Sequence, residues 1–341
     1  MLLKAREHEA INRALDARLS EVKARFKAEL LSDLPPVNTL ANHVERYRGK
    51  LLRPTLVLAA SAAAFEDRAG DAVFQDAVVT VATVAEMVHM ATLVHDDILD
   101  EAEMRRRGAT INHLRGNEAA VMLGDYLISH AYHLCSSLPS ASASRAIAAA
   151  TNTVCEGELL QLHHRGDWEL TERTYFEIIR RKTASLCGVC CRMPAVLAAD
   201  RADGGGDPVA AALFAYGEKL GIAFQIVDDV LDLTGDTEEV GKTLGRDLAK
   251  GKLTLPLIRH LAQCGGAAAA DLPVTGEAGL DAAAARVLSD AVVAGDGLDY
   301  ARERAAGLVA DAKKALGDAV PDGPARRLMM DLADAVLDRQ A

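Results

Sequence analysis

The pattern of apolar and polar positions predicts helices along almost the whole chain. Residues 4–32 carry charges and apolar residues at helical spacing, and "SDLPP" ends this amphipathic segment. Residues 76–104 are apolar on nearly all faces, so we expect a central, buried helix there. Strand-like alternation is hard to find, and the pattern predicts an all-α fold. Further helices are expected near residues 54–65, 117–137, 142–163, 171–185, 186–199, 207–234, 250–263, 280–293, 298–316 and 323–339.

The chain has 341 residues, which is long for one ordinary domain but within reach of a single large helical domain. The stretch "GGAAAADLPVTGEAG" at 265–279 is the best candidate for a loop insertion, and "RADGGGDP" at 201–208 is another. No repeat of fixed short period interrupts the pattern. We therefore interpret residues 1–341 as one α domain with a loop insertion at 265–279.

The composition narrows the class of partner. The net charge of −11 argues against nucleic acid or an anionic membrane surface as the main partner. Charges or histidines interrupt the longest apolar runs, so no transmembrane span is predicted. The first residues resemble neither a signal peptide nor an anchor, which favours the cytoplasm. An anionic substrate would then need a local basic patch or a bound cation.

The cysteines favour a reducing compartment, because they are few and unevenly spaced. Cys187 and Cys190 form a CxxC motif, but no second pair stands at zinc-site spacing and the segment around them is apolar. Buried small side chains are therefore favoured over a metal or redox role. The six cysteines are Cys135, Cys155, Cys187, Cys190, Cys191 and Cys264.

Acidic residues gather where the buried helix is expected to end, in "LVHDDILDEAEMRRRG". Helical spacing lets Asp96, Asp97 and Asp100 converge. They would lie at the negative end of the helix dipole, which disfavours carboxylates unless a cation is present. A solvated acidic turn would explain one such cluster equally well.

A second cluster of the same form makes a structural coincidence hard to accept. "FQIVDDVLDLTGD" places Asp228, Asp229 and Asp232 at the end of another apolar run. Hard carboxylate oxygens suit Mg²⁺, which keeps several waters and is usually shared with substrate phosphates. Two such clusters facing each other would hold several Mg²⁺ ions around a diphosphate.

A bound diphosphate also needs cationic side chains, and short basic motifs supply candidates. A lone surface Lys or Arg is usually a solvated charge, but Arg is a good bidentate phosphate ligand and Lys a good point charge. His89, two turns before Asp96, is either a satisfied core histidine or a donor to phosphate. The motifs are "RGKLLRP" with Lys50 and Arg53, "MRRRG" with Arg105 and Arg106, "RRKTAS" with Lys182 and Thr183, and "VGKTLGRDLAKGKLTLP" with Lys242 and Lys252.

In order and approximate spacing these motifs resemble those of the trans-polyprenyl diphosphate synthases, in particular medium- and long-chain members of the octaprenyl and heptaprenyl type. The resemblance covers residues 45–260 well and "ARRLMMDLADAVLDR" more loosely. It implies a class I isoprenoid synthase helical bundle around a deep central cavity, usually in a homodimer. One departure is "RRRGAT", where the family more often has "RRGKPT", which puts the local turn in doubt. The motifs are "GKLLRP", "HMATLVHDDILDEAEMRRRG", "GDYLIS", "GELLQL", "RRKTAS", "FQIVDDVLD" and "GKTLGRDLAKGKLTLP".

The resemblance implies a role for each matching residue. It implies that Asp96, Asp100 and Asp228 are ligands of Mg²⁺ and that three Mg²⁺ ions accompany the bound diphosphate. Asp97, Asp229 and Asp232 would support these ligands. It makes Arg105, Lys182 and Lys242 the clamp on an allylic diphosphate, with Lys252 at a closing loop. Isopentenyl diphosphate would bind Lys50, Arg53, His89 and Arg106. Thr183 and Gln225 would turn neutral oxygens toward the developing carbocation.

The implied reaction joins isopentenyl diphosphate to geranyl, farnesyl or geranylgeranyl diphosphate in a linear all-trans chain. In such enzymes the chain grows down the helix that carries the first aspartate motif. Ala91 and Thr92 are small, so we expect an open tunnel and a product longer than C20, with a floor at Met87 or Tyr132.

Three alternatives stay open: a farnesyl or geranylgeranyl diphosphate synthase, a terpene cyclase of the same fold, and a non-catalytic partner subunit. Lys50, Arg53 and the second aspartate motif speak against a cyclase, and two complete motifs speak against a partner subunit.

Overall fold

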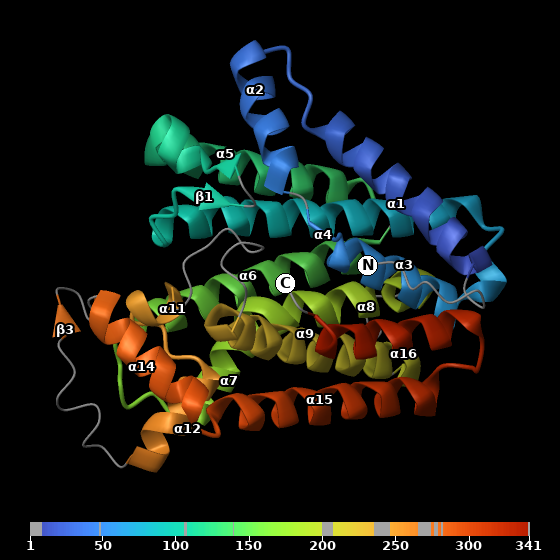
Figure 1. The fold of residues 1–341 in the computed structure, drawn as a ribbon. Coiled ribbons are helices and arrows are strands. Elements are labelled where there is room, and N and C mark those ends of the chain that lie inside the picture. Colours follow the sequence, from blue (N-terminus) through green and yellow to red (C-terminus); the bar gives the residue numbers. More distant parts are fainter. Residues whose placement is uncertain are drawn as a thin grey trace. The chain divides into compact units, whose positions relative to one another are not determined.

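The computed structural model describes residues 9–47, 49–105, 108–138, 140–199, 207–234, 246–264, 274–275, 279–280 and 282–339 (Figure 1). The chain divides into two compact units, each assembled from separated segments. The first unit comprises residues 1–151, 186–217 and 315–332, and the second comprises 152–185, 218–314 and 333–341. The interpretation of residues 1–341 as one domain stays a prediction.

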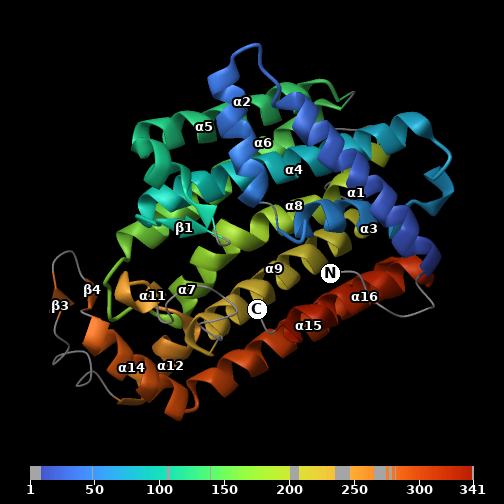
Figure 2. The ribbon, with the colours of Figure 1, turned by 45° about the horizontal axis from the view of Figure 1, so that its top comes forward.

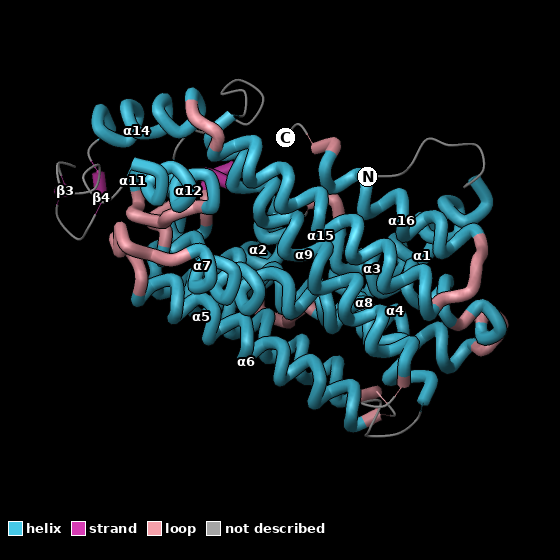
Figure 3. Tube along the Cα trace, turned by 90° about the horizontal axis from the view of Figure 1, so that it is seen from below, coloured by secondary structure: helices cyan, strands magenta, loops and turns pink. Residues whose placement is uncertain are grey.

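Helices dominate both units, which confirms the predicted all-α class. Among the described residues, strands occur as two short antiparallel pairs (Figure 3). β1 (Met104–Arg105) pairs with β2 (Gly108–Ala109), and β3 (Val274–Thr275) pairs with β4 (Gly279–Leu280). The second pair falls in the predicted insertion at 265–279, most of which lies outside the described residues.

The first unit is built around α4 (Ala72–Leu99), the helix expected to be central. α4 contacts α1 (Glu9–Glu29), α3 (Leu52–Ala64) and α5 (Ile111–Ser136), and α4 and α5 lie side by side (Figures 1 and 2). Its apolar residues are buried almost throughout, as their distribution on all faces predicted. The unit also contains α2 (Pro35–Val44), nearly all of α8 (Ser185–Ala199), the short 3₁₀ turns Glu45–Tyr47 and Glu66–Arg68, and parts of α6 (Ala141–His163), α9 (Pro208–Thr234), α15 (Gly297–Ala319) and α16 (Pro324–Leu337).

Both ends of α4 have a local cause. The carboxylate of Asp71 accepts a hydrogen bond from the backbone N–H of Phe74 at 3.0 Å and caps the N-terminus. Glu101 takes a left-handed φ of 47°, which cannot continue a right-handed helix. The helix therefore covers 72–99 and ends before the predicted boundary at 104, so that Asp96 and Asp97 lie in its last turn and Asp100 is its C-cap residue.

The second unit carries the shorter helices of the C-terminal half. α7 (Glu172–Ile179) begins at Thr171, whose hydroxyl accepts from the N–H of Thr174 at 3.2 Å. α7 is followed directly by a π-helical turn, Arg180–Ala184, and α8 begins at Ser185, close to the expected boundary. The unit also contains α11 (Arg246–Ala249), α12 (Leu255–Cys264), α14 (Ala282–Ala294), most of α15 and the second halves of α6 and α9.

Two described helices have the length and apolarity of a membrane span. They are α4 and α9, with mean hydropathies of 1.7 and 1.2 over their most apolar windows. Of these windows, 83% and 44% are buried inside the protein. Because a helix packed in a protein core passes the same test, neither is a clear membrane span.

Candidate active site

The first acidic motif divides its aspartates between two environments. Asp96 and Asp100, one turn apart on α4, are half-buried, whereas Asp97 points inward and is 1% exposed. The guanidinium Nε of Arg105 donates to Oδ1 of Asp97 at 2.8 Å. Burial raises the pKa of Asp97, and the Arg105 charge opposes that rise. Asp97 therefore holds Arg105, while Asp96 and Asp100 have the geometry to reach a ligand together.

Hydrogen bonds stabilise the turn that carries Arg105 and the start of α5, which follows it. The hydroxyl of Thr110 donates to the carbonyl of Ala102 at 2.5 Å. The hydroxyl of Tyr47 accepts from the N–H of Ile111 at 2.9 Å, and the Arg105 guanidinium lies 5.9 Å from the Tyr47 ring centroid. These contacts fix the place of Arg105. Its predicted neighbour Arg106 lies outside the described residues.

The other residues predicted for isopentenyl diphosphate belong to the first unit, where Lys50 precedes α3, Arg53 lies on α3 and His89 lies on α4. Lys50 is exposed, and Arg53 and His89 are half-buried. The Arg53 guanidinium lies close enough to Cys187 and Cys190 to oppose the rise in their pKa.

The CxxC thiols behave as core side chains. Cys187 and Cys190 are each 1% exposed, both are unpaired thiols, and burial raises their pKa. Within the described ranges, no three histidine, cysteine or acidic side chains are arranged to enclose a metal ion. The structure therefore agrees with the interpretation of buried small side chains.

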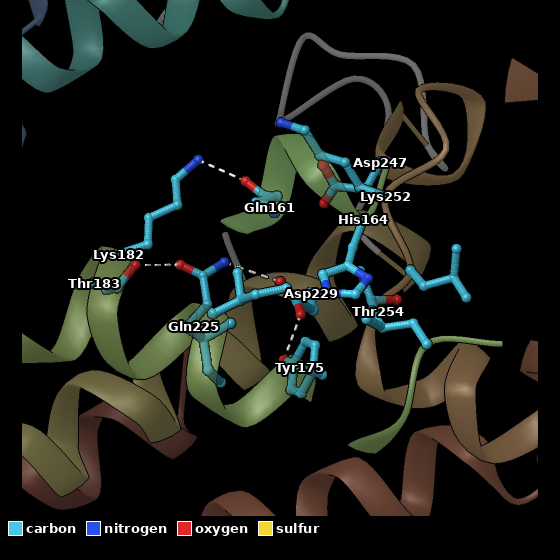
Figure 4. Close-up of a pocket in the computed structure, with 14 residues that line it drawn as sticks. Gln161, His164, Tyr175, Lys182, Thr183, Gln225, Asp229, Asp247, Lys252 and Thr254 are labelled. Atoms are coloured by element: carbon cyan, nitrogen blue, oxygen red, sulfur yellow. Dashed lines mark hydrogen bonds between the residues drawn. The ribbon is translucent and has the colours of Figure 1, made fainter. Parts of the chain in front are cut away.

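A cavity in the second unit gathers many of the predicted residues (Figure 4). Its volume is about 100 Å³. It is lined from α6, α7, the π-helical turn, α9 and the segment 247–254, which are distant in sequence. Its predicted members are Lys182, Thr183, Gln225, Asp229 and Lys252.

A chain of hydrogen bonds crosses this cavity (Figure 4). The Thr183 hydroxyl donates to Oε1 of Gln225 at 3.0 Å, and Nε2 of Gln225 donates to Oδ1 of Asp229 at 2.9 Å. The Tyr175 hydroxyl donates to Oδ2 of Asp229 at 2.6 Å. Burial raises the pKa of Asp229 well above its usual range, and the nearby Asp247 adds to the rise. Each oxygen of Asp229 thus has a protein donor, which orients the amide of Gln225 toward Thr183.

Lys182 lies on the π-helical turn at the edge of the cavity. Its ammonium donates to Oε1 of Gln161 at 2.8 Å and forms an ion pair with Glu158, both on α6. π-Helical turns are rare and occur often at functional sites. The turn changes the direction of the backbone between Arg180 and Ala184, so that Lys182 and Thr183 both line the cavity.

The remaining residues of the second motif are also held by the protein. Oδ1 of Asp228 pairs with the guanidinium of Arg339 at 2.6 Å, and that guanidinium lies 4.0 Å from the Phe224 ring centroid. Oδ2 of Asp232 accepts from the backbone N–H of Asp247 at 3.3 Å. Asp228 is partly exposed, whereas Asp229 is 4% exposed, which repeats the division seen for Asp96 and Asp97. Lys242 lies outside the described residues.

Sequence reasoning missed several cavity residues. Gln161 lies in "GELLQL" and Asp247 in "GRDLAKGK", so quoted motifs already contained a signal for both. The sequence contained no such signal for Tyr175, because its position matches an ordinary apolar position of an amphipathic helix. The cavity residues that were not predicted include Gln161, His164, Tyr175, Asp247 and Thr254.

Comparison with known proteins decides the family. Residues 35–275 match the family model described as polyprenyl synthetase. The chain belongs to the polyprenyl synthetase family. Its similarity to octaprenyl diphosphate synthase of Haemophilus influenzae is 36% identity over 336 residues, covering 96% of each chain. The octaprenyl diphosphate synthase of Escherichia coli is 35% identical over 335 residues, covering 97% of this chain and 98% of the relative.

Solved structures agree with this polyprenyl synthetase assignment. A polyprenyl synthase from Caulobacter crescentus, complexed with calcium and isoprenyl diphosphate, is 32% identical with a TM-score of 0.85, covering 96% of this chain and 97% of that chain. A decaprenyl diphosphate synthase from Rhodobacter capsulatus is 33% identical with a TM-score of 0.85, covering 98% of this chain and 99% of that chain. The predicted family, the isoprenoid synthase fold and the assignment as a prenyltransferase are thereby confirmed.

Proposed function

We propose that this prenyltransferase condenses isopentenyl diphosphate with geranyl, farnesyl or geranylgeranyl diphosphate and releases a linear all-trans polyprenyl diphosphate longer than C20. The observation that carries the proposal is the cavity of the second unit, where Lys182 and Lys252 accompany the hydrogen-bonded chain from Thr183 to Tyr175. Lysines bind diphosphate, and neutral oxygens suit a carbocation that forms beside it. The octaprenyl and decaprenyl names of the relatives support a long product. We place the enzyme in the cytoplasm.

The carboxylates fit divalent cations of the Mg²⁺ type. Asp96 and Asp100 of the first unit, and Asp228 of the second, are half-buried, unlike the buried Asp97 and Asp229, and they offer hard oxygen ligands. Carboxylates of this kind suit Mg²⁺, because it usually keeps waters and shares substrate phosphates. When bound, the ions would neutralise the departing diphosphate. Asp97, Asp229 and Asp232 would support these ligands. We propose that three such ions bind.

Different side chains of the protein would then bind the two substrates. Lys182 and Arg105, with Lys242 and Lys252, would hold the allylic diphosphate while its bond to carbon breaks. Lys50, Arg53, His89 and Arg106 would hold isopentenyl diphosphate so that its double bond meets the allylic cation. Thr183 and Gln225 would face that cation. The new carbon–carbon bond forms with loss of one proton, which the released diphosphate accepts.

Replacing Ala91 by phenylalanine is expected to shorten the product. Ala91, Met87 and Met90 are fully buried on α4, so a benzyl group at residue 91 must occupy space along that helix. The added bulk also costs about 1–3 kcal/mol of stability through overpacking. Products are sized by chromatography after removal of the diphosphate. The floor expected at Met87 or Tyr132 stays a prediction; Met87 is fully buried and Tyr132 is 38% exposed.

Val73→Phe serves as the matched control on the same helix. Val73 is 72% exposed, so a phenyl group there meets solvent and leaves the product unchanged. An A91F enzyme with the wild-type distribution of chain lengths would refute the role of Ala91, and with it the proposal that Thr92 and Ala91 keep a tunnel open.

We further propose a homodimer, with α5 as its contact surface. α5 exposes Val121, Met122 and Tyr132, with 41%, 65% and 38% of their surfaces accessible. Large apolar side chains grouped on one helix commonly mark an interface. Sedimentation equilibrium is expected to give twice the chain mass for the wild type and a lower mass for Met122→Glu. A monomeric wild type would contradict the homodimer.

The proposed function is tested by incubating the purified chain with Mg²⁺, isopentenyl diphosphate and each of the three allylic primers in turn. Chains longer than C20 are expected, and EDTA is expected to abolish them. Products that stop at C15 or C20 would favour a farnesyl or geranylgeranyl diphosphate synthase. A cyclic hydrocarbon made from the primer alone would indicate a cyclase, and no turnover without a second protein would indicate a partner subunit.

A further inference from the structure

α6 approaches the π-helical turn unusually closely at Gly157. A β-carbon at that position would lie 2.5 Å from the backbone nitrogen of Lys182, 2.8 Å from Cβ of Arg181 and 3.0 Å from the carbonyl carbon of Arg181. Two of these three atoms belong to the backbone and cannot rotate away. The contact between α6 and the turn Arg180–Ala184 therefore exists because residue 157 has no side chain.

The residues that follow on α6 hold the side chain of Lys182. Glu158 forms an ion pair with the Lys182 ammonium, in which the two side chains are 16% and 21% exposed. Gln161, one turn further along α6, accepts a hydrogen bond from the same ammonium at 2.8 Å. One stretch of α6 thus fixes the backbone of Lys182 through residue 157 and its ammonium through residues 158 and 161.

We propose that Gly157 and Glu158 are positioning residues for Lys182. Gly157 sets how deeply the π-helical turn lies against α6, and Glu158 holds the ammonium beside Gln161 where a diphosphate can receive it. The same backbone contact fixes Thr183, which follows Lys182 and bonds to Gln225. The inference rests on the proposed function, because it takes Lys182 to be a ligand of the allylic diphosphate.

The first test is Gly157→Ala. One methyl group pushes the turn away from α6, and a displacement of about 1 Å in a positioned group can cost about 100-fold in rate. We expect kcat/KM for the allylic diphosphate to fall about 100-fold, with the KM for isopentenyl diphosphate unchanged. Gly307→Ala on α15 is the matched control, because a β-carbon there meets no atom within 4 Å. It is expected to keep wild-type kinetics.

A double-mutant cycle separates positioning from general support of the fold. If Gly157 acts through Lys182, then G157A adds little to the loss already caused by Lys182→Ala. If residue 157 only supports the fold, the two losses multiply, and both substrates are affected alike. Multiplicative losses, or a folded G157A enzyme with wild-type kinetics, would overturn the role of Gly157.

Glu158→Gln keeps the test decisive should G157A fail to fold. Glutamine retains the shape and an acceptor oxygen but removes the charge that holds the ammonium. We expect kcat to fall about tenfold, as for the loss of one charge-assisted hydrogen bond, and to fall little further when E158Q is added to K182A. Unchanged kinetics of E158Q would overturn the role of Glu158. A wild-type chain that makes no prenyl product would instead refute the proposed function, so the two failures are distinguishable.

Discussion

Replacing Asp228 by asparagine is expected to lower kcat by about 10³-fold while the protein stays folded. Asparagine keeps the size and one acceptor oxygen but loses the negative charge, which weakens its hold on a divalent cation. The Asp228 side chain is 37% exposed and pairs with Arg339 near the end of the chain, so an amide of the same size can be accommodated there. Asp96→Asn on α4 is expected to behave in the same way. The measurement is kcat as a function of Mg²⁺ concentration, with circular dichroism to verify the fold.

Asp229→Asn is the informative comparison, because it lies next to Asp228 but has a different environment. Both oxygens of Asp229 accept hydrogen bonds, from Tyr175 and Gln225, and the side chain is buried. Its loss should destabilise the protein by about 1–3 kcal/mol and leave the Mg²⁺ dependence nearer to wild type. Asp299→Asn, at a side chain that is 86% exposed, controls for an added amide. If D228N and D229N shift the Mg²⁺ dependence equally, the assignment of separate ligand and supporting roles is wrong.

The division of roles within each aspartate motif could be predicted from the sequence only in part. Helical spacing places Asp96 and Asp100 on one face and turns Asp97 about 100° away from Asp96. It does not say what Asp97 meets, because Arg105 reaches it across a turn whose course depends on Glu101 and Thr110. The existence of the clusters was therefore predictable, and their partners were not.

Local backbone geometry accounts for other differences. α5 was expected to begin near residue 117, but it starts at Ile111 and is kinked at Gly116, whose φ of 82° is open to glycine. The helix expected at 250–263 begins only at Leu255, after Gly251, which has a φ of 67°. The π-helical turn at "RRKTAS" has no signal in apolar periodicity, because its extra residue follows from packing against α6. The periodicity thus predicts which segments are helical, and contacts with distant residues decide how each helix bends.

Replacing Lys182 by alanine is expected to lower kcat/KM for the allylic diphosphate by about 10³-fold, because truncation of a buried charged partner costs about 4 kcal/mol. The KM for isopentenyl diphosphate is expected to change little, since a separate set of side chains is proposed to bind it. Lys182→Arg keeps the charge, but its planar group does not fit the place between Glu158 and Gln161, so it should restore only part of the activity. Steady-state kinetics with each substrate varied in turn measure both constants.

Two further variants show whether the loss belongs to the diphosphate or to the fold. Lys219→Ala removes a lysine of the same unit that pairs with Asp311 at 3.1 Å, with side chains 32% and 62% exposed, and it is expected to keep wild-type kinetics. K182A leaves the half-buried Glu158 without its cation, whereas the double variant K182A/E158Q removes both charges. If the stability lost in K182A returns in the double variant while the activity does not, Lys182 acts on the substrate. If activity returns together with stability, the lysine only neutralises Glu158, and the clamp must be built from the other cations.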